Sequence, residues 1–404
     1  MSMAVKAGFA SISRRIMFLI VLTVIIPPLG IDEYTPSLPH MIFPLHATVA
    51  LMQLTVTIYM FAFALGQGTC GYLADSFGRR PIVVWTFPLF LVGSIICIFS
   101  HSISVLYSGR ILQGLGVGGM ALSGPAMIAD CFTGKDINRA SGYYSTVYSF
   151  IPISAPIFGG YIQEYLGWRA NFVFMLILGL IIYAYFLWRM PETHKPTDAD
   201  KINFSNIIRN YSAVLGNKQY MLAVTCMTLT WAMFIVFSIM GPFIIQGRLG
   251  YSPSAYGLMA LLIGLGFFVG NLLNNLIFKK TSALHIIQLG LIIMILMAIL
   301  LLLFPLLGYV NVWVIMSPLF VIMIGAGLCF PHFNADAVSA VPQYAGVAGA
   351  LIGTLILIGT VIITAIITRF HAHSPKIMAS VFLILSVLCL LTHYFSKKSG
   401  RLHA

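Results

Sequence analysis

The chain has 404 residues, of which 59% are hydrophobic and only 8% are charged. A soluble domain does not keep so few charges on its surface, so this composition excludes a soluble enzyme or binding protein and indicates an integral membrane protein. The formal net charge of +12 at pH 7 is large, and the positions of the basic residues decide whether it concerns a nucleic acid or a membrane.

Apolar runs long enough to cross a bilayer recur along the sequence. A hydrocarbon core of about 30 Å needs about 20 apolar residues per helix. Twelve such runs lie approximately at 16–37, 47–70, 81–100, 104–129, 140–163, 170–189, 219–246, 253–278, 282–304, 309–332, 344–368 and 376–396. The sequence therefore predicts an all-α integral membrane protein with twelve spanning helices.

The basic residues fall mainly on one side of this predicted topology. If the N-terminus is cytoplasmic, most of the 22 lysines and arginines lie in cytoplasmic segments, as the positive-inside rule requires. Both termini are then predicted to be cytoplasmic. The net charge thus indicates orientation and contact with anionic lipid, and it predicts no nucleic-acid partner.

The two halves of the chain echo each other. A polar stretch separates six predicted spans from the next six, and "GYLADSFGRR" in the first half corresponds to "NLLNNLIFKK" in the second. A second echo sets "GLGVGG" at 114–119 against "GAGLCF" at 325–330. Such weak similarity is typical of transporters built from parallel repeats, with the binding site between the repeats. The predicted domains are two six-helix bundles and a cytoplasmic linker, at 1–190, 218–404 and 191–217 respectively.

The first span ends in "GIDEYTPSLP", which contains two adjacent acids, Asp32 and Glu33. Counted at 1.5 Å per residue from Ile16, Asp32 lies roughly 24 Å along the helix, and Arg110 of the fourth span lies roughly 9 Å below the outer surface. These two side chains have similar depth and opposite charge. Glu33 lies about 100° around the helix from Asp32, so we interpret it as an interfacial carboxylate near water.

Two interpretations of Asp32 stay open. Ionisable groups at membrane depth are costly and usually face a cavity or a partner, and a carboxylate whose partner and hydration change between two conformations also changes its affinity for protons. Asp32 and Arg110 are therefore candidates for proton coupling. The alternative is that Asp32 only caps or locks the first helix against Arg110. Because the second half has no acid inside a predicted span, charge chemistry is predicted in the first half.

The loop after the second span, "GYLADSFGRRPIV" at 71–83, combines glycines, an acid and two arginines. Glycine allows close helix approach and a tight turn, and aspartate accepts hydrogen bonds from arginine. Another aspartate ends the fourth span on the same side of the membrane. The pattern predicts a conformational latch made of Gly71, Asp75, Gly78, Arg79, Arg80 and Asp130.

The fifth span contains "SAPIFGG", with Pro156, Gly159 and Gly160. Proline interrupts the backbone hydrogen bonds of a helix and glycine permits close packing. A hinge or a sliding surface is predicted here.

Other polar and aromatic side chains in the spans are candidates to line a substrate cavity, because such pockets combine apolar walls with a few polar groups. Packing between helices is the alternative for each of them. His332 also belongs to a residue type that titrates near neutrality. The candidates are Tyr34, Tyr59, Gln113, Tyr144, Tyr148, Trp231, Phe234 and His332.

Several kinds of chemistry lack their motifs. The sequence has no phosphate-binding GxxxxGK[ST] loop and no polar segment long enough for a nucleotide-binding domain, which excludes ATP-driven transport by this chain. It has no HExxH or similar set of metal ligands or nucleophiles, and its six cysteines lie in or beside spans without paired spacing. We therefore predict no cofactor, no metal, no nucleotide and no enzymatic activity.

These motifs resemble those of the major facilitator superfamily. "GYLADSFGRRP" is similar to its loop signature GxLaDrxGrrP, "YSGRILQGLGVGG" to its RxxQGxG motif in helix four, and "APIFGG" to the antiporter motif GPxxGG in helix five. More specifically, "IDEYTPSLP", "QLTVTIYMFAFALGQ", "GWRANFVF" and "MPET" resemble the 12-span drug and proton antiporters of the bicyclomycin and chloramphenicol resistance type. The resemblance covers essentially the whole chain.

The resemblance implies roles for particular residues. In that family the helix-one aspartate and the helix-four arginine are implicated in proton and substrate coupling, which implies this role for Asp32 and Arg110. The loop motif likewise implies a latch of Asp75 and Arg79 with Asp130 as their partner. Val24 stands where some multidrug relatives carry a second helix-one carboxylate, which leaves Asp32 as the acid best placed to carry a proton from the first span.

The combined prediction is a proton-coupled secondary transporter of the bacterial inner membrane. It is expected to export a drug or small amphipathic metabolite in exchange for protons by alternating access. Its expected partners are the small-molecule substrate, protons and membrane lipids, and it is expected to act as a monomer driven by the proton gradient. One alternative is a proton symporter that imports a nutrient or siderophore. Another is a non-transporting membrane receptor or scaffold, which needs neither Asp32 and Arg110 nor the glycine-spaced loop.

Overall fold

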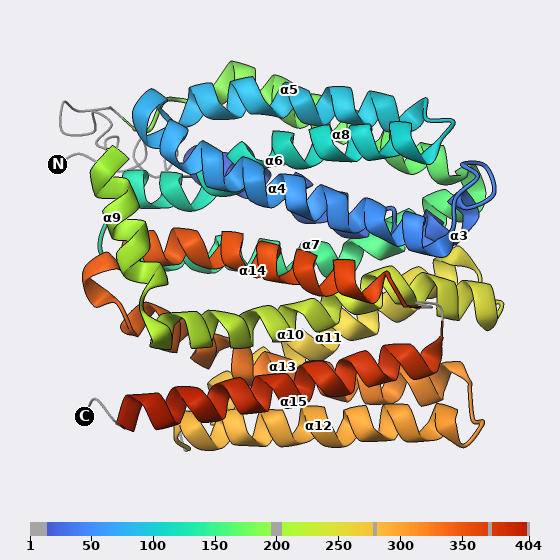
Figure 1. Cartoon of the computed structure of the whole chain (residues 1–404). Helices are drawn as coiled ribbons and strands as arrows, with labels where there is room; N and C mark the ends of the chain where they lie inside the picture. Colours follow the sequence, from blue (N-terminus) through green and yellow to red (C-terminus); the bar gives the residue numbers. More distant parts are fainter. Residues whose placement is uncertain (1–13, 195–203, 278–280, 371–373, 402–404) are drawn as a thin grey trace. The chain divides into compact units, whose positions relative to one another are not determined.

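The computed structural model describes residues 14–194, 204–277, 281–370 and 374–401, and all regular structure within these ranges is helical (Figure 1). A helix at 14–23 comes first. The following elements are α2 (Ile26–Asp32), η1 (Thr35–Ser37), α3 (Leu38–Met41), α4 (Val49–Phe77), α5 (Arg79–Ile98), α6 (Ile103–Cys131), α7 (Lys135–Leu166), α8 (Trp168–Arg189), α9 (Phe204–Leu215), α10 (Lys218–Pro242), η3 (Phe243–Arg248), α11 (Pro253–Ile277), α12 (Ala283–Leu306), α13 (Val312–Ser339), η4 (Pro342–Tyr344), α14 (Ala345–Ile367) and α15 (Pro375–Arg401).

Most of these helices correspond to the predicted spans. Among the described residues, 11 helical segments are long and apolar enough to cross a membrane. The predicted fifth span lies in α7, which has 32 residues and is therefore about 48 Å long, but its composition is too polar to place it among the 11. The chain is a multi-pass membrane protein, and the count of twelve spans stays a prediction.

The first predicted span is a broken helix. It reaches from Arg14 to Met41, with a turn at residues 24–25 before α2. Pro27 and Pro28 follow within the first turn of α2, where proline is tolerated because the first backbone N–H groups of a helix have no partner inside it. The break makes α2 a short, separate helix that ends at Asp32.

Short polar residues begin several of the long helices. Ser102, Asn217 and Asn311 each accept a hydrogen bond from a backbone N–H in the first turn of α6, α10 and α13 respectively. These contacts satisfy donors that have no partner within the helix. Gly78, with φ of 100°, separates α4 from α5, a conformation that side chains other than glycine rarely adopt.

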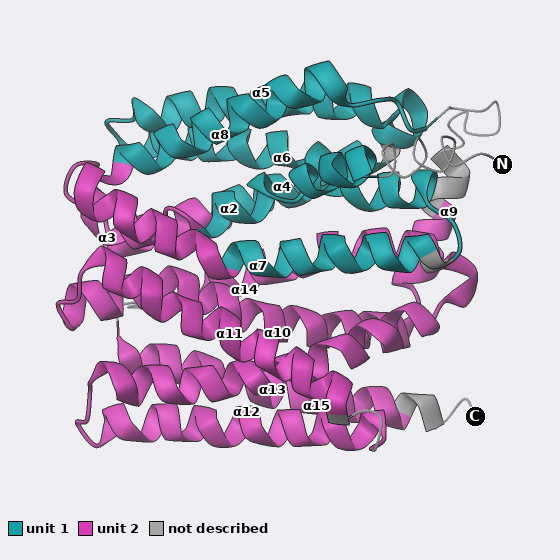
Figure 2. Cartoon of the chain, turned by 180° about the vertical axis from the view of Figure 1, so that it is seen from behind, with its two compact units in different colours: residues 1–32, 58–152, 169–203 teal, residues 33–57, 153–168, 204–404 magenta. Residues whose placement is uncertain are grey.

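The chain forms two compact units, which Figure 2 distinguishes by colour. Unit 1 contains 1–32, 58–152 and 169–203, and unit 2 contains 33–57, 153–168 and 204–404. Parts of the first half of the sequence therefore pack with the helices of the second half inside unit 2. The predicted domains stay a prediction; the part of the linker at 195–203 and the echo residue Lys280 lie outside the described residues.

Within unit 1, glycines bring the backbones of neighbouring helices together. A methyl group added at Gly93 of α5 would lie 2.6 Å from the carbonyl oxygen of Gly109 in α6, and one added at Gly66 of α4 would lie 2.7 Å from the Leu115 carbonyl oxygen. At Gly71 an added methyl group would meet Leu122 at 3.5 Å, an ordinary contact. The close approach expected at Gly71 is thus made earlier in α4, at Gly66.

Unit 2 contains a similar crossing of α12 and α13. A methyl group added at Gly290 would lie 2.7 Å from the carbonyl oxygen of Gly325, and one added at Gly325 would lie 2.7 Å from that of Gly290. The two crossings lie at different places along their helices, because Gly109 is the seventh residue of α6 (Ile103–Cys131) and Gly325 is the fourteenth of α13 (Val312–Ser339). The sequence echo of 114–119 with 325–330 stays a prediction.

Candidate functional site

Arg110 lies fully buried in α6, in the interior of unit 1. Its Nη2 donates to the carbonyl oxygen of Gly30 at 2.6 Å, and its Nη1 donates to Oε1 of Gln113 at 2.7 Å. The guanidinium also lies over the ring of Tyr59, 4.2 Å from the ring centre, where the electron-rich face attracts a cation. The Tyr59 hydroxyl in turn donates to the carbonyl oxygen of Pro27 at 2.9 Å. Arg110 is thereby fixed against the first membrane span.

Gln113 carries this buried network to α5. Its Nε2 donates to Oγ of Ser94 at 2.8 Å, and both side chains are fully buried. The network spans the two helices because α5 and α6 approach closely at Gly93 and Gly109, where an added Cβ would meet the facing backbone. A satisfied buried network of this kind holds its members in one geometry, and here it orients the Arg110 guanidinium.

Asp32 is the last residue of α2, two positions after the Gly30 carbonyl that binds Arg110, and it is 2% exposed. The sequence placed Asp32 and Arg110 at similar depth, and the structure anchors Arg110 to the turn of helix that carries Asp32. Glu33 is also fully buried, so it does not lie at a water interface as we had expected.

Three of the predicted latch residues, Asp75, Arg79 and Asp130, meet at one end of unit 1. Nη1 of Arg79 lies 2.6 Å from Oδ1 of Asp75, and its Nε lies 3.1 Å from Oδ2 of Asp130. Asp75 and Arg79 are one helical turn apart in sequence, whereas Asp130 comes from the end of α6. The arginine fork thus ties the end of α4 to the end of α6.

Glu192 joins the same group, and we did not predict its role. Its two carboxylate oxygens accept hydrogen bonds from the backbone N–H groups of Arg79 and Arg80, at 2.9 and 3.1 Å. A carboxylate at a helix N-terminus is favoured by the exposed N–H groups and by the helix dipole. Asp75, Arg79, Asp130 and Glu192 together form what we call the inner ionic cluster. The signal available in the sequence was the acid of "MPET", which follows the sixth predicted span.

The three residues of the helix-five motif lie against other segments of unit 2. A methyl group added at Gly159 would collide with the carbonyl oxygen of Glu33, and one added at Gly160 would collide with that of Pro253 in α11. The carbonyl of Pro156 lies against Gly257 of α11. No side chain fits at these glycines, so α7 contacts both segments through its backbone.

The end of α7 carries one more polar contact. Oε2 of Glu164, just beyond the predicted fifth span, accepts from the backbone N–H of Ser254 at 3.1 Å. Hydrogen bonds from the side chain and backbone of Ser254 hold the pKa of Glu164 below its usual value. This exposed carboxylate therefore stays ionised in its contact with the start of α11.

The candidate cavity residues are distributed over both units. In unit 1, Tyr59 and Gln113 are engaged in the Arg110 network, and the rings of Tyr144 and Tyr148 stack with centres 6.4 Å apart. In unit 2, the Tyr34 hydroxyl is bonded to Oγ1 of Thr55, Trp231 stacks on Phe234, and Nε2 of His332 lies 2.7 Å from Oδ1 of Asn274. That these side chains line one substrate cavity stays a prediction.

Comparisons with known proteins agree with these features. The sequence matches the Major Facilitator Superfamily over residues 16–364. An uncharacterized transporter of Rickettsia bellii is 28% identical over 382 residues, which cover 91% of this chain and 93% of that protein. A bicyclomycin resistance protein homolog of Haemophilus influenzae is 24% identical, with 95% of this chain and 97% of that protein covered.

A solved structure shows the likeness of the fold. The POT family transporter PepTSo superposes with a TM-score of 0.76 over 95% of this chain and 98% of its own, at 14% sequence identity. The family match extends over most of the sequence, and the relatives and the fold are those of transporters rather than of enzymes. The chain therefore belongs to the Major Facilitator Superfamily and is a membrane transporter of small molecules.

Proposed function

We propose that this transporter exports a drug or another small amphipathic compound across the bacterial inner membrane in exchange for protons. The observation that carries the proposal is the buried Arg110, whose hydrogen bond to Gly30 fixes it beside the turn of helix that ends at Asp32. The relative named for bicyclomycin resistance supports a drug-like substrate.

Asp32 is the proton carrier in this mechanism. Removing a carboxylate from water favours its protonated form, and a nearby cation favours its ionised form. Gly30 and Gln113 orient the Arg110 guanidinium, and the hydrogen bond to Gly30 holds its positive charge near the turn of helix that ends at Asp32. A movement that changes the distance from Asp32 to Arg110, or the hydration of Asp32, therefore binds or releases a proton.

The inner ionic cluster provides a two-state contact for alternating access. Arg79 makes two ion pairs and Glu192 holds the start of α5, so the arrangement has a definite closed geometry. Forming these contacts in one conformation and losing them in the other would bias the equilibrium between the two. Asp32 then couples that equilibrium to protons, and the substrate couples it to transport.

Energised inside-out vesicles test the direction of exchange. Candidate substrates are first selected as drugs that shift the thermal unfolding of the purified transporter. Respiration or ATP hydrolysis then acidifies the vesicle lumen, and the selected compounds are added. Antiport predicts that an added substrate alkalinises the lumen in vesicles containing the transporter and not in control vesicles. Failure of every binding compound to move protons would contradict the proposal. Proton uptake coupled to substrate entering the cytoplasm in whole cells would instead support symport.

A further inference from the structure

Segments from both halves of the sequence meet inside unit 2. Residues 33–57, which connect the first two predicted spans, belong to this unit together with α10 and η3. In the predicted topology these segments lie toward the outer side of the membrane. A transporter that works by alternating access must separate them to open outward, so the contacts between them decide how easily that happens.

Gln246 of η3 bonds to this connecting segment twice. Its Nε2 donates to the carbonyl oxygen of Pro36 at 2.9 Å, and its Oε1 lies 3.1 Å from Nε2 of His40. Because an amide oxygen can only accept, the His40 ring carries a proton on Nε2 and donates it. Gln246 is 8% exposed, so water competes little for these two hydrogen bonds, which we call the outer clasp.

The helix that carries Gln246 is irregular at this point. Gln246 follows Pro242, and the backbone N–H of Leu249 bonds to the carbonyl of Ile244, five residues earlier, at 3.0 Å. This π-helical turn inserts one residue into the α-helical pattern, a feature that is frequent at functional sites. A regular continuation of α10 would present a different side of η3 to Pro36 and His40.

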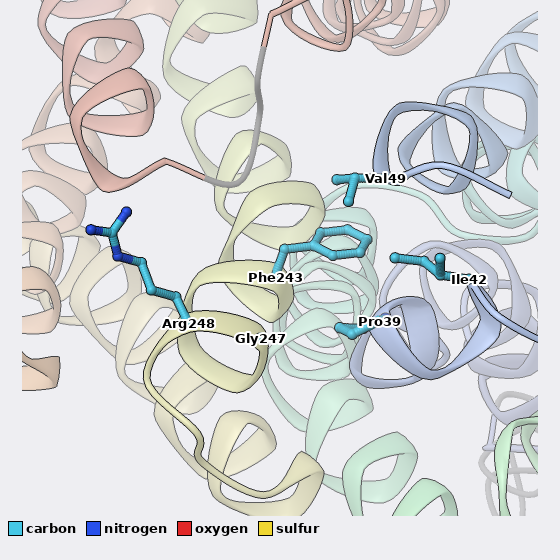
Figure 3. A pocket seen from close by; sticks show the side chains of 6 residues that line it. All are labelled: Pro39, Ile42, Val49, Phe243, Gly247 and Arg248. Carbon is cyan, nitrogen blue, oxygen red and sulfur yellow. The ribbon is translucent and has the colours of Figure 1, made fainter.

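An open pocket of about 480 Å³ adjoins the outer clasp. Pro39 and Gly247, the sequence neighbours of His40 and Gln246, both line it, and Figure 3 shows Phe243 facing Ile42 across the same space. The Arg248 side chain points away from these apolar groups (Figure 3). Since this side of the clasp is not packed, breaking its two hydrogen bonds requires little displacement of other side chains.

Two other contacts of the connecting segment lie in more closely packed surroundings. Nε2 of the fully buried Gln53 donates to the Ile239 carbonyl at 3.0 Å, and the Glu33 carbonyl lies directly against Gly159. In the first contact a buried amide binds a backbone carbonyl, and in the second two backbones touch directly. Compared with these two contacts, the outer clasp borders open space, which its neighbours Pro39 and Gly247 line.

We propose that Gln246 is a positioning residue that holds the outer side of the transporter closed, and that release of the outer clasp begins outward opening. The inference rests on the alternating-access function proposed above. Gln246 acts through the segment it holds, and each of its amide atoms has a separate part: the NH2 group retains Pro36 and the oxygen retains His40.

Hydrogen exchange of the full-length transporter in lipid nanodiscs, read by mass spectrometry, tests the role of Gln246. Gln246→Ala is expected to speed exchange in peptides from 33–57 by about tenfold, the size expected from losing two hydrogen bonds of ordinary net strength. His40→Leu removes one of them and should give a smaller increase. Gln288→Ala, at an exposed position on α12, is the matched control and should change nothing in 33–57.

The Gln246→Glu variant tests whether the hydrogen bonds of residue 246, rather than its packing, hold the segment 33–57. The introduced carboxyl group, when ionised, keeps acceptors for His40 but cannot donate to Pro36, whereas its protonated form can. The charged and titratable groups of the elements that form the clasp are His40 in α3 and Arg248 in η3. Exchange in 33–57, each time relative to the wild type at the same pH, should be fast at pH 7.5 and return toward the wild-type rate at pH 4.5.

Two results would overturn the proposal: wild-type exchange in Gln246→Ala, or no recovery at low pH in Gln246→Glu. If Gln246→Ala does not fold, the pH series of Gln246→Glu and the His40→Leu variant decide the question. These measurements need neither substrate nor a proton gradient. If the variants do not change amide hydrogen exchange in 33–57 but the transporter still exchanges substrate for protons, only this inference is refuted. If the variants change amide hydrogen exchange as expected but substrate drives no proton flux, only the proposed transport mechanism is refuted.

Discussion

The α5–α6 crossing of unit 1 and the α12–α13 crossing of unit 2 have the same backbone design and different polar contents. Gly93 and Gly109 meet in the first, and Gly290 and Gly325 meet in the second. In unit 1 the residue after Gly109 is the buried Arg110, whereas in unit 2 the residue after Gly325 is Ala326, which is also fully buried.

The next position along each helix shows the same contrast. Gln113 follows Gly109 by four residues and binds both Arg110 and Ser94. Cys329 follows Gly325 by the same interval, and its Sγ donates to the Ile287 carbonyl. A close glycine crossing therefore does not require charge, since the crossing in unit 1 has a buried cation beside it and the crossing in unit 2 has none at the same spacing. This difference supports the proposal that proton coupling involves Arg110 in unit 1.

Arg110→Ala is expected to have the largest effect, because it removes the charged donor at the centre of the buried network in unit 1. The Gly30 carbonyl and the Gln113 amide oxygen lose a charged donor, at a cost of about 1–3 kcal/mol for each buried group left unsatisfied. Coupled transport should fall below detection in vesicles. Arg110→Lys keeps the charge without the two-pronged geometry and should retain a fraction of the activity. Wild-type transport by the alanine variant would remove Arg110 from the mechanism.

Alanine at the crossing glycines tests the shared scaffold. A Cβ at Gly109 would lie 2.9 Å from the Gly93 carbonyl oxygen, and a Cβ at Gly325 would lie 2.7 Å from that of Gly290. Overpacking of this kind costs about 1–3 kcal/mol, so both variants should unfold at similarly lower temperatures when purified. Gly142→Ala, where no atom lies within 4 Å, should leave the unfolding temperature unchanged or raise it. A large loss at only one crossing would show that the two are not equivalent.

Glu192→Ala should have the smallest effect of the three. The start of α5 loses acceptors for two backbone N–H groups, worth about 0.5–2 kcal/mol at a helix N-terminus, and the solvent exposure of Glu192 favours the low end. We expect a small drop in unfolding temperature and a slower transport rate with proton coupling unchanged. Asp136→Asn, in the first turn of α7, serves as the control for removing an acid. A Glu192→Ala transporter with the wild-type rate would exclude Glu192 from the latch.

The sequence was most informative where a signal is local. Apolar runs located the helices because lipid excludes charge over a fixed length, and Asp75 and Arg79 were expected together because both belong to the same short loop motif. Arg110 and Asp130 could be named from residue type and depth. The family resemblance supplied the roles that residue chemistry left open.

Contacts between segments far apart in the sequence could not be predicted in the same way. Gln246 and Pro36 are 210 residues apart, and Glu192 is 113 from Arg79. A glutamine near the end of an apolar run has no distinctive pattern. The direction in which Gln246 points depends on a π turn that helical periodicity does not reveal. Glu33 was misjudged for a related reason, since its backbone lies against Gly159 of α7, a residue far away in the sequence.

Proton flux driven by substrate in Asp32→Asn is the most direct test of proton-coupled transport. The asparagine has nearly the same shape and cannot exchange a proton, so the variant should express, fold and bind substrate while added substrate no longer alkalinises the lumen of energised inside-out vesicles. Substrate movement down its own gradient measures transport without coupling in the same vesicles. Loss of proton flux with substrate binding retained is the predicted result. Wild-type proton flux in Asp32→Asn would contradict the assignment of Asp32 as the proton carrier.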